Sequence, residues 1–80
     1  MYLGSKIEMV MKVENKLKVF RAMKNITQEE LAIKVELSRQ TINAIEKGKF
    51  LPSVYSALKI AAYFAVNIEE IFYLNKEETK

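Results

Sequence analysis

A chain of 80 residues, half of them hydrophobic, is long enough for one small core and too short for two. Cysteine and histidine are absent, which excludes disulfides and thiol chemistry and removes the commonest general base and metal ligand, so we expect no enzyme, no metal and no cofactor. The formal charge is +3, and residues 14–50 hold eight Lys and Arg against five Glu, which favours a polyanionic partner.

Residues 1–13 differ in pattern from the rest of the chain. Apolar side chains alternate from Ile7 to Val13, which is the period of a β-strand. A lone strand needs a partner, so this N-terminal extension either pairs with a second copy across a dimer axis or has no fixed structure. A third interpretation places the biological start at Met11, because "MKVENKLK" would open a complete domain. All three are compatible with the sequence.

Residues 15–24 predict a first helix, with Leu17 and Phe20 on its inner face and Val19 and Met23 as weaker candidates. Scarce glycine and proline along the chain favour helices joined by short corners.

Two further helices follow, each with a clear beginning. Thr27 and Glu30 form a capping box that opens a second helix over residues 28–35. Ser38 caps a third helix from residue 39 to about residue 47, and Gly48 is placed to end it.

Ser53 is expected to cap a fourth helix over residues 54–64. Its predicted inward positions are Val54, Ala57, Leu58, Ala61 and Phe64. Asn67 caps a last helix through Leu74, and residues 75–80 read as a frayed tail. The longest apolar run, residues 60–66, is too short to span a membrane, and no secretion signal is visible, so we expect a cytoplasmic protein.

The second and third helices have the features of a helix-turn-helix corner. Ala32 is small enough for the next helix to lie close, and Leu37 can fill the turn. The third helix would then expose Arg39, Gln40 and Asn43 from its first turns. Arginine pairs with guanine, and glutamine or asparagine pairs with adenine, so this face is suited to reading bases.

Two segments, "ITQEELAIKVELSRQTINAIEKGKFLPS" and "ALKIAAYFAVNIEEIF", together resemble the lambda-repressor-like helix-turn-helix family of Cro/cI-type regulators. The resemblance implies an all-α, compact five-helix domain over residues 14–74, with the helix-turn-helix at residues 27–47. It also implies a sequence-specific transcriptional regulator, most often a repressor, that binds a two-fold operator in double-stranded DNA as a homodimer. An antitoxin or protein-interaction module on the same fold, with a protein partner in place of DNA, is the alternative.

The resemblance also assigns roles to single residues. Arg39, Gln40 and Asn43 would read bases. The expected DNA-backbone contacts are Gln28, Thr41, Lys47, Lys49 and the main chain near Phe50, and Thr41 could instead contact a thymine methyl group. Arg21 and Glu46 would form an ion pair within the fold.

Glu36 and Ala65 stand where the family usually has glycine. If Glu36 adopts a positive φ, we expect a strain of about 1 kcal/mol, which lowers stability without altering the reading face. A cluster on the last two helices could form an association surface; its members are Tyr55, Tyr63, Tyr73 and Leu74. Alternatively, the tyrosine rings pack against the body and their hydroxyls face solvent.

Overall fold

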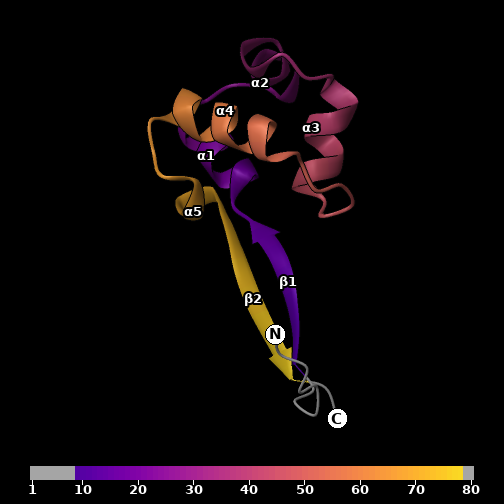
Figure 1. Ribbon diagram of the computed structural model, residues 1–80. Helices are drawn as coiled ribbons and strands as arrows, with labels where there is room; N and C mark the ends of the chain where they lie inside the picture. Colours follow the sequence, from indigo (N-terminus) through magenta and orange to yellow (C-terminus); the bar gives the residue numbers. More distant parts are fainter. Residues whose placement is uncertain (1–8, 79–80) are drawn as a thin grey trace.

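The computed structural model describes residues 9–78, with side chains described for residues 12–75. A body of short helices carries a two-stranded ribbon that extends away from it (Figure 1). In chain order the elements are β1 (Met9–Asn15), α1 (Leu17–Met23), α2 (Gln28–Val35), α3 (Arg39–Glu46), α4 (Val54–Phe64), α5 (Ile68–Ile71) and β2 (Phe72–Glu78).

Helices α2, α3 and α4 begin at the caps predicted from the sequence. The hydroxyls of Thr27, Ser38 and Ser53 accept the backbone N–H three residues later, at 3.0 to 3.1 Å. Each bond satisfies a donor that the first helical turn leaves without a partner. The capping box is complete, because the Glu30 carboxylate accepts the Thr27 N–H at 2.8 Å.

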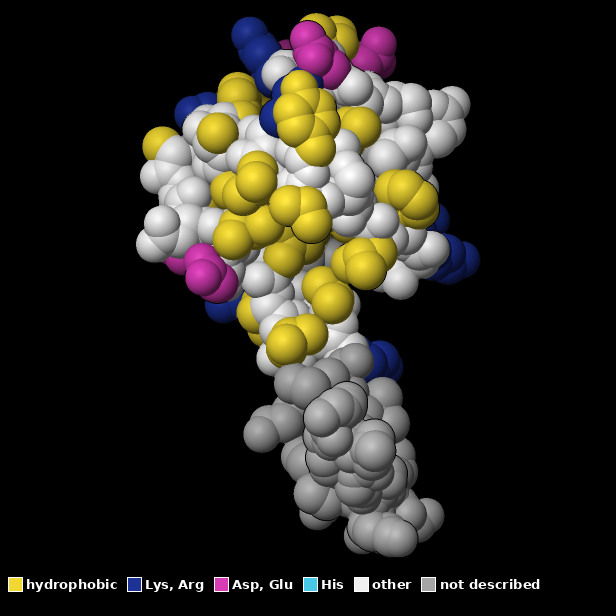
Figure 2. Space-filling model, in the orientation of Figure 1, with side chains coloured by type: hydrophobic (Ala, Val, Ile, Leu, Met, Phe, Trp, Pro, Cys, Tyr) yellow, Lys and Arg dark blue, Asp and Glu magenta, His cyan; other side chains and the backbone are white. Residues whose placement is uncertain are grey.

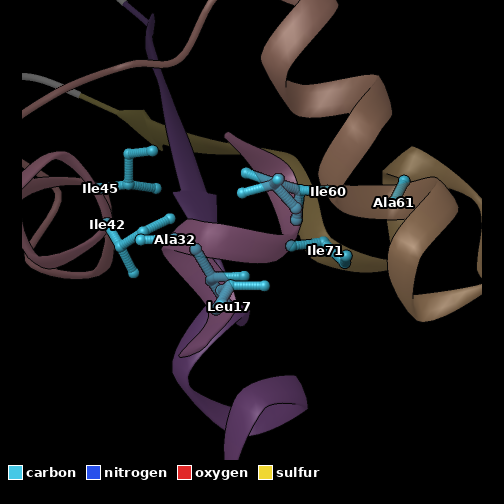
Figure 3. Close-up of a cluster of buried hydrophobic side chains, with 9 residues drawn as sticks. Leu17, Ala32, Ile42, Ile45, Ile60, Ala61 and Ile71 are labelled. Atoms are coloured by element: carbon cyan, nitrogen blue, oxygen red, sulfur yellow. The ribbon is translucent and has the colours of Figure 1, made fainter. Parts of the chain in front are cut away.

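A single apolar core holds the helices together. Leu17, Leu31, Ile42, Ile60 and Ile71 are completely buried, one from each of the five helices. Figure 3 shows Leu17, Ile42, Ile60 and Ile71 within this cluster. Burying an aliphatic side chain of this size contributes roughly 1.5–3 kcal/mol. Every fully buried residue in the described part of the chain is apolar, so this core is held by packing.

Two of the five inward positions predicted for α4 are wrong. Val54 is 73% exposed and Leu58 is 50% exposed, whereas Ile60 is completely buried. The buried stripe of α4 is Ala57, Ile60 and Ala61. Val54 lies in the first turn, where the chain arrives from an exposed loop, and Leu58 falls outside the helical stripe that the core residues define.

The predicted last helix and tail are also corrected. Helix α5 ends at Ile71, and the chain continues as β2, antiparallel to β1, with Val13 opposite Leu74. The partner of the N-terminal strand is therefore a segment of the same chain. The Lys16 N–H donates to the Ile71 carbonyl at 2.8 Å, where the two strands leave the helical body. This backbone hydrogen bond links the end of α5 to the base of the ribbon. Ile7, part of the alternating pattern, lies outside the described residues.

Candidate nucleic-acid interface

The corner between α2 and α3 forms although it lacks a glycine. Glu36 ends α2 in the left-handed region at φ 61°, and the Leu37 N–H donates to the Ala32 carbonyl at 2.9 Å. Leu37 packs against the core, as predicted. The Glu36 carboxylate pairs with Lys59 of α4, and this hydrogen bond lowers the pKa of Glu36 and raises that of Lys59. The strained corner is thus tied to α4.

The first turn of α3 presents two polar side chains to solvent. Arg39 and Gln40 are both exposed, and neither has a hydrogen-bond partner among the described residues. Thr41 is half-buried, and its hydroxyl lies 2.8 Å from that of Ser38. Ile42 and Ile45 on the opposite face are buried, so α3 is held by its apolar side and its polar side is left open.

An ion pair joins α1 to α3, as the resemblance implied. Arg21 Nε donates to Glu46 Oε2 at 2.7 Å, and Nη2 donates to Oε1 at 3.2 Å. The third guanidinium nitrogen donates to the Ile26 carbonyl at 2.9 Å. The hydrogen bond that Arg21 donates to Glu46 raises the pKa of Arg21. The carboxylate is nearly buried, with 4% of the side chain exposed, so the pair has a structural role.

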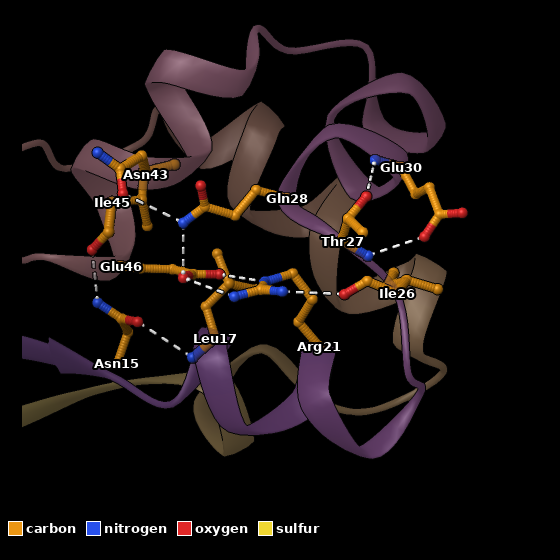
Figure 4. Close-up of polar contacts among 10 residues, drawn as sticks. All are labelled: Asn15, Leu17, Arg21, Ile26, Thr27, Gln28, Glu30, Asn43, Ile45 and Glu46. Carbon is orange, nitrogen blue, oxygen red and sulfur yellow. Dashed lines mark hydrogen bonds and ion pairs between the residues drawn. The ribbon is translucent and has the colours of Figure 1, made fainter.

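Gln28 connects this pair to the exposed face of α3. Its side-chain nitrogen donates to Glu46 Oε1 at 3.1 Å and to Asn43 Oδ1 at 3.2 Å (Figure 4). Gln28 and Asn43 are thus brought together, a contact that sequence reasoning missed. Residues fifteen positions apart meet only because the corner folds α2 against α3.

The far end of α3 carries the remaining predicted contacts. Lys47, Lys49 and Phe50 are exposed around Gly48, which has φ 75°. Asn15, at the end of β1, donates to the Ile45 carbonyl at 2.9 Å and accepts the Leu17 N–H at 3.0 Å. It therefore fixes α3 relative to α1 and the ribbon. No sequence motif singled out this residue; only its place before the first helix, as a capping type, could have done so.

The two lysines that flank α1 are directed to aromatic rings. Lys16 Nζ lies 5.6 Å from the Tyr73 ring centroid, and Lys24 Nζ lies 5.2 Å from that of Tyr63. These are cation–π distances. Both lysines are exposed and are not part of the α3 face.

Within residues 9–78, acidic side chains form no cluster that could hold a metal ion. The same part of the chain has no helix long and apolar enough to cross a membrane.

A short helix seated on a tight corner, apolar inside and polar outside, defines a helix-turn-helix protein. The helix-turn-helix family model matches residues 17–71, and the chain belongs to this family of Cro/cI-type, DNA-binding transcriptional regulators, which are not enzymes.

The relatives carry the same description. The chain is 56% identical over 66 residues to an HTH-type transcriptional regulator of Methanocaldococcus jannaschii, covering 82% of this chain and all of that protein. It is 43% identical over 65 residues to the HTH-type regulator YgzD of Bacillus subtilis, covering 81% and 98%. Among solved structures, the restriction-modification controller protein C.AhdI from Aeromonas hydrophila matches with a TM-score of 0.64 at 30% identity, covering 68% of this chain and 82% of that one.

Proposed function

We propose that this protein binds double-stranded DNA sequence-specifically by inserting α3 into the major groove. The observation that carries the proposal is the first turn of α3, where Arg39 and Gln40 are exposed and have no hydrogen-bond partner among the described residues, while the opposite face is buried. Base edges are met by this part of a recognition helix. Arg39 offers two donors suited to guanine, and Gln40 offers a donor and an acceptor suited to adenine.

Flanking groups supply the contacts to the DNA backbone in this proposal. Lys47 and Lys49 would bind phosphates beside the C-terminal end of α3, together with the main chain at Phe50. Thr41 would donate its hydroxyl to a phosphate next to the first turn. Gln28 would use its backbone N–H, which the first helical turn leaves without an intrahelical partner, because both side-chain amide protons are already bonded.

We infer that the protein binds as a homodimer and that the exposed face of α4 forms the interface. Leu51, Val54, Tyr55 and Leu58 are each at least 50% exposed. Hydrophobic side chains gather over α4 and towards the base of the ribbon on the face shown in Figure 2. A hollow of about 450 Å³ between the ribbon and the loop before α4 borders this surface; Phe50 and Leu51 line it on the apolar side, and Lys12 and Lys49 also line it.

Charge supports a second copy as the occupant of this face. Between Lys49 and Glu69 the only charged residue is Lys59, which is paired with Glu36. A two-fold interface brings a patch against itself, so a patch of one charge sign repels its copy and a nearly uncharged apolar patch does not. The surface of α1, in contrast, carries exposed lysines, so two copies of that surface would repel each other.

The dimensions also fit a two-fold operator. The two shorter dimensions of the molecule are 22 and 20 Å between Cα atoms. Two bodies in contact, each with a layer of side chains, have centres on the order of 30 Å apart. Half-sites one helical turn apart require about 34 Å. We propose repression as the outcome, because a dimer that covers one turn of DNA would exclude other proteins from it.

Selection of bound duplexes from a random-sequence pool tests the proposal. We expect a consensus with two-fold symmetry and half-site centres about 10 base pairs apart. A pool that stays unenriched after repeated rounds at moderate salt would overturn sequence-specific binding, and a consensus without symmetry would overturn the homodimer.

A further inference from the structure

The side-chain amide of Asn43 has a fixed orientation, and that orientation decides which bases it can read. Its oxygen faces Gln28, and its nitrogen has no hydrogen-bond partner among the described residues (Figure 4). Asparagine is suited to adenine only when its oxygen accepts from N6 while its nitrogen donates to N7. In this structure that oxygen already accepts a hydrogen bond from Gln28.

The orientation follows from a chain of donors and acceptors that begins at Arg21. A guanidinium can only donate, so both oxygens of Glu46 are held as a carboxylate that can only accept. The Gln28 atom that meets Glu46 Oε1 at 3.1 Å must therefore be the amide nitrogen. The second proton of that nitrogen points to Asn43 at 3.2 Å, so the Asn43 atom there must be the oxygen. No other assignment of the two amides satisfies all the contacts.

We propose that the relay from Arg21 through Glu46 and Gln28 fixes Asn43 as a hydrogen-bond donor, so that it selects guanine, or secondarily thymine, and rejects adenine. Guanine offers two neighbouring acceptors, N7 and O6, in the major groove, and thymine offers O4. Adenine presents its N6 amino group beside N7, and two amino groups that face each other leave a donor unsatisfied. This inference rests on the proposed function and corrects the pairing of Asn43 with adenine that its residue type alone suggests.

Gln28 is thus a positioning residue for specificity. Turning the Asn43 amide by half a rotation would bring two amino groups together at 3.2 Å and break the bond to Gln28. When Gln28 is replaced by a residue without an amide, Asn43 is free to turn, and adenine becomes acceptable.

Selection from a random duplex pool with three proteins tests the relay. The wild type, Asn43→Ala and Gln28→Met are compared, with methionine chosen because it keeps the length of the side chain without its donor. The position read by Asn43 is the one whose preference disappears in Asn43→Ala. The wild type is expected to favour guanine or thymine there, and Gln28→Met is expected to raise the ratio of adenine to guanine by about tenfold. Thermal unfolding followed by circular dichroism shows whether each variant is folded.

The other outcomes overturn the inference in distinguishable ways. Adenine selected by the wild type contradicts the fixed orientation. An unchanged preference in folded Gln28→Met contradicts the relay. If Asn43→Ala alters no position, or weakens all sequences equally, Asn43 reads no base, while the proposed function still stands on the remaining consensus. If the wild type yields no consensus, the proposed function fails as well.

Discussion

Glu46 of α3 accepts a hydrogen bond from Arg21 of α1 at 2.7 Å, and its side chain is only 4% exposed. The same carboxylate orders Gln28 at the start of α2. Three helices of the fold therefore meet at one acidic side chain next to the reading face. Stability and specificity are coupled at this point, because the residues that hold α3 in place also hold Asn43.

Glu46→Ala is expected to lower the free energy of unfolding by about 3 kcal/mol, because it leaves the guanidinium of Arg21 poorly paired. Urea denaturation measures the change. Lys18→Ala, on the exposed side of the same α1, should change stability by no more than about 0.5 kcal/mol. A loss for Glu46→Ala no larger than that of Lys18→Ala would contradict a structural role for the pair.

Ala65→Gly is expected to stabilise the fold by about 0.5–1 kcal/mol. Ala65 ends α4 at φ 58°, a left-handed conformation that costs an L-residue roughly 1–2 kcal/mol and that glycine adopts freely. Greater freedom of glycine in the unfolded chain offsets part of the gain. Ala62→Gly, three residues earlier within α4, is the matched control and should destabilise by about 1 kcal/mol. Melting temperatures that shift in the same direction for both variants would refute the strain at Ala65.

The Glu36–Lys59 pair should make stability depend on pH at the acidic end. The folded-state pKa of Glu36 is lowered by Lys59, so its contribution is present above the ordinary carboxyl value of 4.5 and is lost as pH falls through the lower folded value. The difference in melting temperature between wild type and Glu36→Gln should therefore shrink between about pH 6 and pH 3. A difference that stays constant over this range would show that the pair contributes nothing.

Glutamate placed on the exposed face of α4 is expected to produce monomers. Tyr55→Glu with Leu58→Glu would bring like charges together across the two-fold axis, and sedimentation velocity should show the loss of the dimer. Met23→Glu supplies the control, because Met23 is 70% exposed on α1, away from this face. If the double variant still forms dimers, the interface does not lie on α4. If the wild type is monomeric at all concentrations, the proposed homodimer is wrong.

Local signals in the sequence predicted most of the helical body. Thr27, Ser38 and Ser53 mark the helix starts, because a cap is a bond between residues three positions apart. Glu36 and Ala65 stand where the resembled family usually has glycine, and both adopt a left-handed conformation. These features depend on neighbours along the chain, which the sequence shows directly.

The ribbon could not be predicted in the same way. Strand β2 exists because β1, more than 55 residues earlier, supplies its backbone partner, and a pairing of such separation leaves no local signature. The Gln28–Asn43 contact was missed for a related reason, since two amides show no mutual pattern until the corner brings them together. The exposure of Val54 and Leu58 depended on which side of α4 meets the core, and several apolar stripes were available.

Affinity for a selected operator, compared with a scrambled duplex of the same length and salt concentration, tests most directly that α3 reads DNA. We predict that the wild type binds the operator at least 10³-fold more tightly. Arg39→Ala should lose about 1–3 kcal/mol on the operator and little on the scrambled duplex, whereas Lys49→Ala should weaken both equally and reduce the salt slope by about one. Equal affinities for the two duplexes, or an Arg39→Ala variant with undiminished preference for the operator, would contradict the proposal.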